Sequence, residues 1–200
     1  MDAITLLRKD HELVEQLFKQ FEKLTERAQK SKKALVQKMI RELAVHSAIE
    51  EMLFYPAVRM AALKADTRAG EKLADTVLES LEEHHIVKWV LSELDGMRPD
   101  DERFEAKVKV LTENVRHHIE EEQEEMFPKV QKLMDQAMLD ELGQRMAKAK
   151  KLAPTRPHPR APDTPPGNLV AGTMAAVMDK SKDLLRDLVS RRRSSSPTSS

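Results

Sequence analysis

One arrangement of histidine and glutamate occurs twice in this chain and limits what the chain can fold into. In the first copy His46 precedes Glu50 by four residues, and 72 residues later His118 precedes Glu122 by the same interval. Each copy also has a histidine upstream, 35 residues earlier in the first and 34 in the second. A spacing of four places both side chains on one face of an α-helix. The repeat therefore yields one set of candidate metal ligands: His11, His46, Glu50, His84, His118 and Glu122.

The composition predicts an all-α protein. Gly is scarce, at five residues in 200, whereas Leu, Glu, Lys, Ala, Met and Arg, which favour helix, are abundant. The absence of Cys excludes disulfides, thiolate metal ligands and a Cys nucleophile. The N-terminal segment becomes charged too early for a secretory signal, and no apolar run approaches the roughly 20 residues that span a bilayer. We therefore expect a soluble, cytoplasmic protein without a transmembrane segment.

The chain carries no net charge, but its charge is unevenly distributed. Residues 153–200 contain eight Lys and Arg against four Asp, a net charge of +4, which leaves −4 on residues 1–152. An acidic body argues against nucleic-acid binding by the folded domain.

Apolar residues recur at helical spacing through the first 150 residues, with breaks where turns belong. Ser31 is a suitable N-cap for the second helix, and the segment 95–100, Asp-Gly-Met-Arg-Pro-Asp, is a strong turn signal before the fourth. Long helices with short connections imply an antiparallel up-down four-helix bundle. We expect its helices at about residues 4–29, 31–63, 67–94 and from the turn to about 134, with a short fifth helix at 135–151.

Pro56 and Pro128 fall inside two of the expected helices, at equivalent positions of the repeat. Proline has no backbone N–H and disturbs an α-helix that continues through it. We therefore predict that both helices are kinked or interrupted there as a repeated structural feature. The alternative is an ordinary helix end near each proline.

The chain divides into a bundle at 1–152, a linker at 153–167 and a tail at 168–200. Six of the ten prolines lie in 153–167, so we expect an extended, disordered linker. Residues 169–189 are weakly amphipathic and could form one more helix, whereas the Arg- and Ser-rich end is of low complexity. We expect the basic tail to be mostly disordered, and its partner stays unknown.

In an antiparallel bundle, residues meet when they lie at similar distances from a shared turn. Counted from turns near residues 30, 65 and 98, the four histidines and Glu50 lie about 14 to 20 residues away, and at ~1.5 Å per residue these offsets agree to within a turn or two, so all six can share one layer. All six also fall on the apolar stripes of their helices, whereas His117 is out of phase. On the third helix the repeat favours His84, which follows His11 by 73 residues, but two leucines precede His85 at helical spacing, so His85 stays an alternative.

Two carboxylates and four imidazoles at one level of an apolar core would be costly to desolvate without compensating charge. A single buried His or Glu is more often a structural or solvated residue, but six together need another explanation. The apolar stripes offer no Arg or Lys in phase beside them. Mixed imidazole and carboxylate ligation without sulfur predicts two iron ions in a non-haem, carboxylate-bridged centre, with manganese or zinc as alternatives. None of the six candidates forms the Glu-x-x-His spacing of ferritin-like bundles.

These residues resemble the hemerythrin-like (HHE cation-binding) domains over residues 1 to about 150. The resemblance is carried by Asp10-His11, by His46-x-x-x-Glu50-Glu51 before Phe-Tyr-Pro56, by Glu83-His84, and by His118-x-x-x-Glu122 before Met-Phe-Pro128. It implies a four-helix bundle that holds a non-haem di-iron centre, with Glu50 and Glu122 as bridging carboxylates. It also implies a protein that binds oxygen or nitric oxide, senses oxygen or iron, or protects against oxidative and nitrosative stress.

The sequence departs from the oxygen-carrying hemerythrins at one position. Those place a further His one helical turn after the third-helix ligand, where this chain has Lys88, or Trp89 if His85 is the ligand. At least one coordination position on the metals is then left for water, His85 or a nearby Glu. Sensing, iron handling or redox chemistry is therefore favoured over reversible oxygen carriage.

The preferred hypothesis is a binding or sensor protein whose di-iron centre responds to oxygen, nitric oxide, redox state or iron. The alternative is a di-iron enzyme that acts on peroxide, nitric oxide or ferrous iron in stress protection. Protonatable groups near the site, such as Tyr55, His85, His117 and Glu121, could deliver protons to such an enzyme. The sequence shows no separate substrate-binding motif, which weakens the enzyme alternative. A third interpretation is a structural adaptor whose histidines no longer bind metal.

Overall fold

Helices are the only regular secondary structure among the described residues. The computed structural model describes residues 1–25, 27–161 and 179, and no β-strand occurs among them. The elements in chain order are α1 (Ala3–Glu22), α2 (Gln29–Ile49), η1 (Glu50–Phe54), α3 (Tyr55–Lys64), α4 (Arg68–Gly96), α5 (Phe104–Glu121), η2 (Glu122–Met126), α6 (Phe127–Leu133) and α7 (Gln136–Lys150), where η1 and η2 are π-helical turns.

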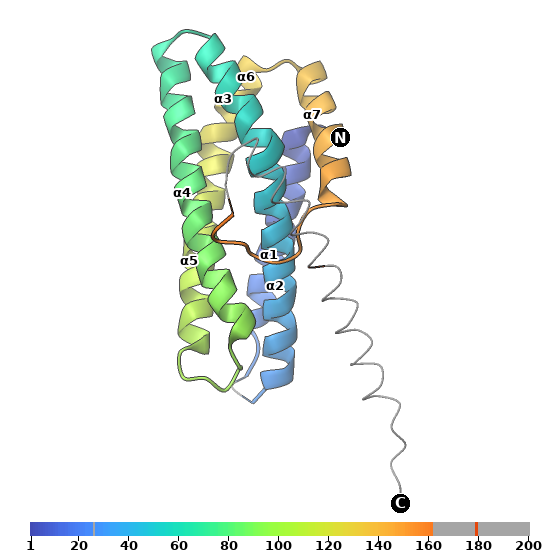
Figure 1. Cartoon of the computed structure of the whole chain (residues 1–200), viewed down its shortest axis with the longest axis vertical. Coiled ribbons are helices and arrows are strands. Elements are labelled where there is room, and N and C mark those ends of the chain that lie inside the picture. Colours follow the sequence, from blue (N-terminus) through green and yellow to red (C-terminus); the bar gives the residue numbers. More distant parts are fainter. Residues whose placement is uncertain (26, 162–178, 180–200) are drawn as a thin grey trace, which may run out of the picture.

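Four helical rods run up and down the long axis of the molecule (Figure 1). The rods are α1, then α2 continued by η1 and α3, then α4, and then α5 continued by η2 and α6. Consecutive rods are antiparallel because short connections join them. The shorter α7 packs against α1 and α2. The expected antiparallel four-helix bundle with a short fifth helix is therefore confirmed.

The apolar core consists of two clusters with a layer of buried polar side chains between them. One cluster fills the end covered by α3, α6 and α7 and includes Phe54 and Phe127. The other fills the opposite end and includes Phe18 and Phe104. On each rod, the buried apolar residues before and after the candidate histidine belong to different clusters, apart from Val45, which adjoins His46. The histidines therefore lie at the level where the two clusters meet.

Helix starts are set by side-chain caps at three places. Asp2, Thr67 and Asp135 each accept a hydrogen bond from the backbone N–H three residues later, at the starts of α1, α4 and α7. The prediction that Ser31 caps the second helix is wrong. That helix begins at Gln29, because the Ala28 carbonyl already accepts the first helical hydrogen bond, so Ser31 lies inside it.

Both prolines follow a π turn, and the α-helix then resumes. The Tyr55 N–H donates to the Glu50 carbonyl, and the Phe127 N–H donates to the Glu122 carbonyl, each five residues back. Pro56 and Pro128 then stand in the first turn of α3 and α6, where a missing N–H leaves no helical hydrogen bond broken. The predicted repeated interruption is therefore confirmed, and the alternative of an ordinary helix end is wrong.

The first part of the Pro-rich segment lies against the bundle. Residues 153–161 form turns and bends, with Ala153 buried and Arg156 paired with Asp95 at 2.6 Å. Asp179 is buried and helical, and its carboxylate accepts hydrogen bonds from the backbone N–H groups of Thr155 and Arg156. Apart from Asp179, the rest of the expected linker and tail, including the segment 169–189 that could form a helix, lies outside the described residues. The boundaries at 153 and 168 stay predictions.

Among the described residues, no helix combines the length and the apolar character that crossing a membrane requires.

Candidate metal centre

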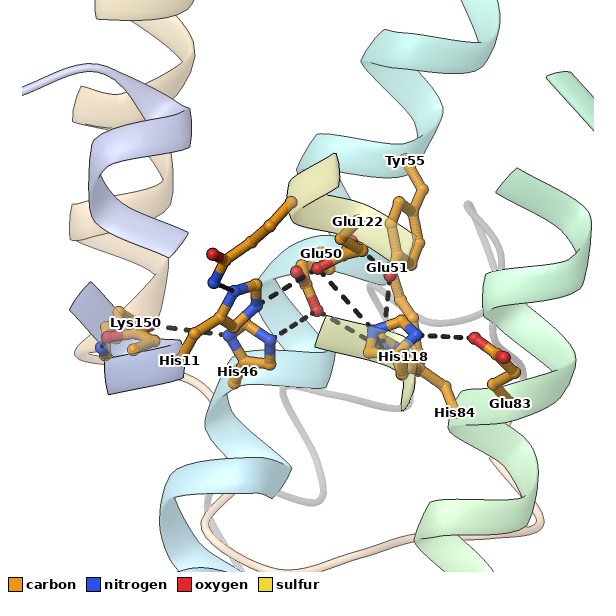
Figure 2. A network of polar contacts seen from close by, with 12 residues as sticks. His11, His46, Glu50, Glu51, Tyr55, Glu83, His84, His118, Glu122 and Lys150 are labelled. Carbon is orange, nitrogen blue, oxygen red and sulfur yellow. Dashed lines mark hydrogen bonds and ion pairs between the residues drawn. The ribbon is translucent and has the colours of Figure 1, made fainter. Parts of the chain in front are cut away.

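The six residues predicted from the repeat converge in the polar layer. All six are buried, and each of the four rods contributes at least one of them. Figure 2 shows their side chains pointing toward one another from separate helices. Their donor atoms form two groups, each within 4.8 Å, and these groups are His11, His46, Glu50 and Glu122, and Glu50, His84 and His118.

The two carboxylates lie between the histidines. Glu50 Oε2 lies 3.1 Å from Nε2 of His46 and 3.4 Å from Nε2 of His84. Glu122 Oε2 lies 3.2 Å from Nε2 of His11 and 3.8 Å from Nε2 of His118. Each carboxylate therefore faces one histidine from each half of the repeat.

Many of these atoms have no hydrogen-bond partner among the described residues. They include Nε2 of His11 and His46, both oxygens of Glu50, and Oε2 of Glu122. Buried polar atoms are nearly always satisfied, because leaving them unpaired is costly. Cations between them would accept the nitrogen lone pairs and neutralise the carboxylates, so the donor set fits two metal ions.

Burial separates His84 from its neighbour. His84 is 2% exposed and its Nε2 lies 3.2 Å from Nε2 of His118, whereas His85 is exposed. His117 also lies outside the layer, with 64% of its side chain exposed. The fold therefore brings the residue that the repeat favoured into the site.

A second ring of side chains contacts the outer nitrogens of the histidines. Glu51 Oε1 lies 3.0 Å from Nδ1 of His84, and Glu83 Oε2 lies 2.7 Å from Nδ1 of His118. Such contacts fix the ring and its tautomer, which leaves the Nε2 lone pair for a metal.

The other half of the repeat has equivalent partners. Gln123 Nε2 lies 2.9 Å from Nδ1 of His11, and Asp10 Oδ2 lies 3.7 Å from Nδ1 of His46. In the structure the Gln123 oxygen accepts from Arg8 Nη1 at 3.2 Å. A metal at Nε2 of His11 would require the reverse orientation of this amide, in which the Gln123 oxygen accepts the Nδ1 proton.

Two lysines lie behind this ring. Lys88 is buried and contacts Glu51, and Lys150 of α7 contacts Asp10. The expectation that no Lys or Arg lies in phase beside the site is therefore wrong at Lys88, which stands one turn after His84 on the same helix face. Both lysines pair with the outer acids, and the inner carboxylates Glu50 and Glu122 are left for cations.

The π turns bring an aromatic residue to each half of the layer. The Tyr55 hydroxyl donates to Glu122 Oε1 at 3.0 Å and lies 3.3 Å from Nε2 of His84. Phe127, its equivalent in the repeat, stacks parallel to the ring of His11 with centroids 5.9 Å apart. Of these two aromatic residues, only Tyr55 carries a hydroxyl, and this hydroxyl is directed at the centre.

The metal-free layer holds an unstable combination of charges. Burial, and next the Glu122 carboxylate, raise the pKa of Glu50 well above its usual range. Burial alone would also raise the pKa of Glu122, but the nearby His118 and His11 bring it below its usual range. Against the opposing effect of burial, Glu122 and Glu83 raise the pKa of His118. Without a cation, these groups cannot all take the charges that ligation requires.

Burial keeps two of the histidines neutral. It lowers the pKa of His46 to about 4, and burial together with the nearby His118 holds the pKa of His84 well below its usual range. A neutral imidazole is the form that binds a metal. Both rings are therefore ready to act as ligands at neutral pH.

A small cavity adjoins the four histidines. Its volume is about 10 Å³, close to the lower limit for one water molecule. Besides the histidines, it is lined by Ser47 and by apolar side chains of four helices: Val14, Leu43, Val87, Val115 and Ile119. This space admits a very small molecule and leaves no room for an organic substrate.

The outer ring was missed in the sequence, although the repeat carries a signal for it. Glu51 and Gln123 directly follow the two glutamates, and Asp10 and Glu83 directly precede the upstream histidines. Lys150 carries no such signal, because it lies 140 residues from Asp10 and only the packing of α7 joins them.

Known proteins share this sequence pattern and fold. A sequence model of the hemerythrin HHE cation binding domain matches residues 2–130. An uncharacterised hemerythrin-like protein of Schizosaccharomyces pombe is 31% identical over 144 residues, which are 72% of this chain and 68% of that protein. A hemerythrin HHE cation binding domain-containing protein from Mycobacterium kansasii aligns with a TM-score of 0.61 and 24% identity over 76% of this chain and 86% of that one, which shows a common fold.

The matched residues 2–130 are well over half of the chain and include all six converging side chains. The chain therefore belongs to the hemerythrin HHE cation-binding family.

Proposed function

We propose that this protein holds two iron ions in a non-haem, carboxylate-bridged centre and binds oxygen or nitric oxide there, as a sensor of oxygen, nitric oxide, redox state or iron. The observation that carries the proposal is the position of the two inner carboxylates. Glu50 lies between His46 and His84. Glu122 lies between His11 and His118 in the same way. A carboxylate with an imidazole on each side is suited to bridge two cations.

The donor set supports iron. Each position combines two imidazole nitrogens with shared carboxylate oxygens and no sulfur, a mixture that suits iron and also fits manganese or zinc. When bound, iron would supply the electrons and the open coordination position that a diatomic ligand requires.

The surroundings support a small ligand. The cavity beside the histidines has apolar walls and a volume of about 10 Å³, so it excludes organic substrates and bulk water. The residues of the chain then have separate tasks: the histidines and inner glutamates hold the metals, the outer ring fixes the imidazoles, and the apolar walls keep the site dry.

The test is anaerobic reconstitution of the full chain with ferrous iron, followed by optical titration with oxygen and with nitric oxide. We expect a new absorption band that saturates at one ligand per two irons and reverses when the gas is removed. The variant His117→Ala, which removes an exposed imidazole, should behave like the wild type. Two bound irons whose spectrum changes with neither gas would contradict gas binding.

A second candidate function, a di-iron enzyme acting on peroxide, is favoured by Tyr55. Burial, and next the Glu122 carboxylate, raise the pKa of Tyr55 well above its usual range, so its hydroxyl keeps its proton beside the centre. Reduction of peroxide to water consumes protons, and a positioned donor contributes about 100-fold or more to such a reaction.

Peroxide turnover by the iron-loaded protein separates the two candidates. With an external reductant such as ascorbate present to supply the two electrons of each turnover, an enzyme should reduce peroxide repeatedly and lose most of that rate in Tyr55→Phe without losing iron. Reversible gas binding with no turnover would instead support the sensor and contradict the enzyme.

A further inference from the structure

Lys88 is placed where neither packing nor ligation requires a lysine. It stands one helical turn after His84 on α4 and is only 7% exposed. Its Nζ lies 3.1 Å from each carboxylate oxygen of Glu51, which is also buried. Lysine is almost never buried unless it is paired, because an ammonium group is costly to remove from water. Among the described residues, Glu51 is the carboxylate that compensates the charge of Lys88.

The same carboxylate holds a candidate ligand. Glu51 Oε1 lies 3.0 Å from Nδ1 of His84, and Nε2 of that ring faces Glu50 at 3.4 Å (Figure 2). A carboxylate at Nδ1 keeps the proton there and leaves the Nε2 lone pair directed at the centre. Lys88, Glu51 and His84 thus form a chain that ends at the metal position of His84 and His118.

His11, the equivalent of His84 in the first half of the repeat, has an amide rather than a charged group at its Nδ1. Gln123, which occupies the position of Glu51 72 residues later, contacts Nδ1 of His11 at 2.9 Å. The residue one turn after His11, equivalent to Lys88, is Glu15, which is half-buried and pairs with Arg116 at 2.9 Å. Between these two equivalent positions, a buried lysine stands only where the partner of the histidine is a carboxylate.

We propose that Lys88 is a positioning residue for the metal position of His84 and His118. It compensates the buried charge of Glu51 and so holds that carboxylate against the imidazole. The inference rests on the proposed metal binding and adds that the two equivalent ligands His84 and His11 are supported differently, one by a charged pair and one by an amide.

The experiment is an anaerobic titration of full-length proteins with cobalt(II), whose visible absorption reports its ligands. Lys88→Met should weaken one of the two positions about 10–100-fold, the usual effect of losing an outer partner of a ligating histidine, and leave the other nearly unchanged. The double variant Lys88→Met/Glu51→Gln copies the Gln123 half and should recover most of the lost affinity. Lys88→Arg should keep it, and Lys72→Met, which removes an exposed lysine of α4, is the matched control.

Two results would overturn the proposal. One is Lys88→Met with both cobalt positions at wild-type affinity. The other is a double variant no tighter than Lys88→Met, because a lysine that only fills space would not be rescued by a change at Glu51. If Lys88→Met does not fold, the double variant decides, since it contains no unpaired buried charge and should regain both folding and cobalt binding.

Long-range ¹H–¹⁵N spectra of the metal-free proteins separate this proposal from the proposed function. The wild-type ring of His84 should carry its proton on Nδ1, Lys88→Met should show a mixture of tautomers, and the double variant should restore the Nδ1 form. A wild-type proton on Nε2 would overturn the positioning role even in a protein that binds two cobalt ions. The expected tautomers in a protein that binds no cobalt would support the positioning role and refute metal binding.

Discussion

Glu50 and Glu122 are the two residues on which the proposed centre most depends. Both are buried between apolar clusters, and most of their oxygens have no hydrogen-bond partner among the described residues. Burial raises the pKa of Glu50, and the Glu122 carboxylate raises it further, because two carboxylates so close together oppose each other's ionisation. A pair of cations removes this conflict and stabilises charges that would otherwise destabilise the core.

Replacing Glu50 with Gln should reveal that dependence. We expect the metal content to fall from two per chain to one or none, because a neutral amide bridges two cations poorly. The metal-free variant should be at least as stable as the metal-free wild type, since it no longer buries a carboxyl beside Glu122. Elemental analysis and thermal unfolding with and without metal measure both effects. Glu120→Gln, at an exposed position of α5, is the control, and a variant that still binds two metals with wild-type affinity would refute the bridging role.

The repeat spacing and the apolar stripes together predicted the residues that converge, with His85 left as an alternative to His84. They were not enough for the groups behind them. Glu51 and Gln123 are polar residues next to the two glutamates, and their contacts cross from one rod to another. In the sequence, Lys88 stands where the oxygen-carrying hemerythrins have a further histidine ligand. In the structure, Lys88 pairs with Glu51. Such a pair depends on how two helices are rotated, which periodicity does not specify.

At the scale of elements, the π turns determine what surrounds the inner glutamates. Tyr55 follows Glu50 by five residues, which in an α-helix would place it about 140° around the axis. The extra residue of η1 brings it back toward the centre, where its hydroxyl meets Glu122. Proline indicates a missing donor and so predicted an interruption at both copies, but it carries no information on whether the chain ends, kinks or forms a π turn.

The close packing of α3 on α4 gives a prediction for this scale. A Cβ at Gly70 would lie 2.2 Å from the carbonyl oxygen of Ala62, a backbone atom that cannot move alone. Alanine favours a helix over glycine by about 1 kcal/mol, yet Gly70→Ala should destabilise the fold by roughly 1–3 kcal/mol because of this overlap. Gly96→Ala is the control, because a Cβ there meets nothing within 4 Å. Chemical denaturation compares the two, and equal stabilities would contradict the packing of α3 on α4.

At the scale of the whole molecule, the polar layer joins all four rods at one level. The bundle was predictable because its rods are long and periodic, and the offsets from the turns placed the six residues in one layer. The contribution of α7 was not predictable, since its Lys150 pairs with Asp10, 140 residues away in the sequence. Metal binding at this level should stabilise the entire bundle rather than one helix, because the metal binds only the folded arrangement.

This stabilisation should grow as the pH rises. Glu50 and His118 have raised pKa values in the metal-free fold, and each must lose its proton to bind a metal, so protons compete most at low pH. The metal-free fold also loses stability as the pH rises through these raised values, because the unfolded chain gives up the same protons more readily. His46, with a pKa of about 4, does not compete near neutrality.

Calorimetry of the metal-loaded and metal-free proteins between about pH 5.5 and about pH 8 measures this effect. The difference between their Tm values should widen steadily toward the higher pH. A difference that stays constant or narrows would show that Glu50 and His118 do not exchange protons for metal.

Whether the six converging side chains hold two iron ions is answered by the metal content of the full-length protein. Elemental analysis should be made on protein purified without chelators or a chelating tag, before and after anaerobic reconstitution with ferrous iron. We predict two iron ions per chain. A chain that carries no iron even after reconstitution would contradict the dinuclear centre and the functions proposed from it.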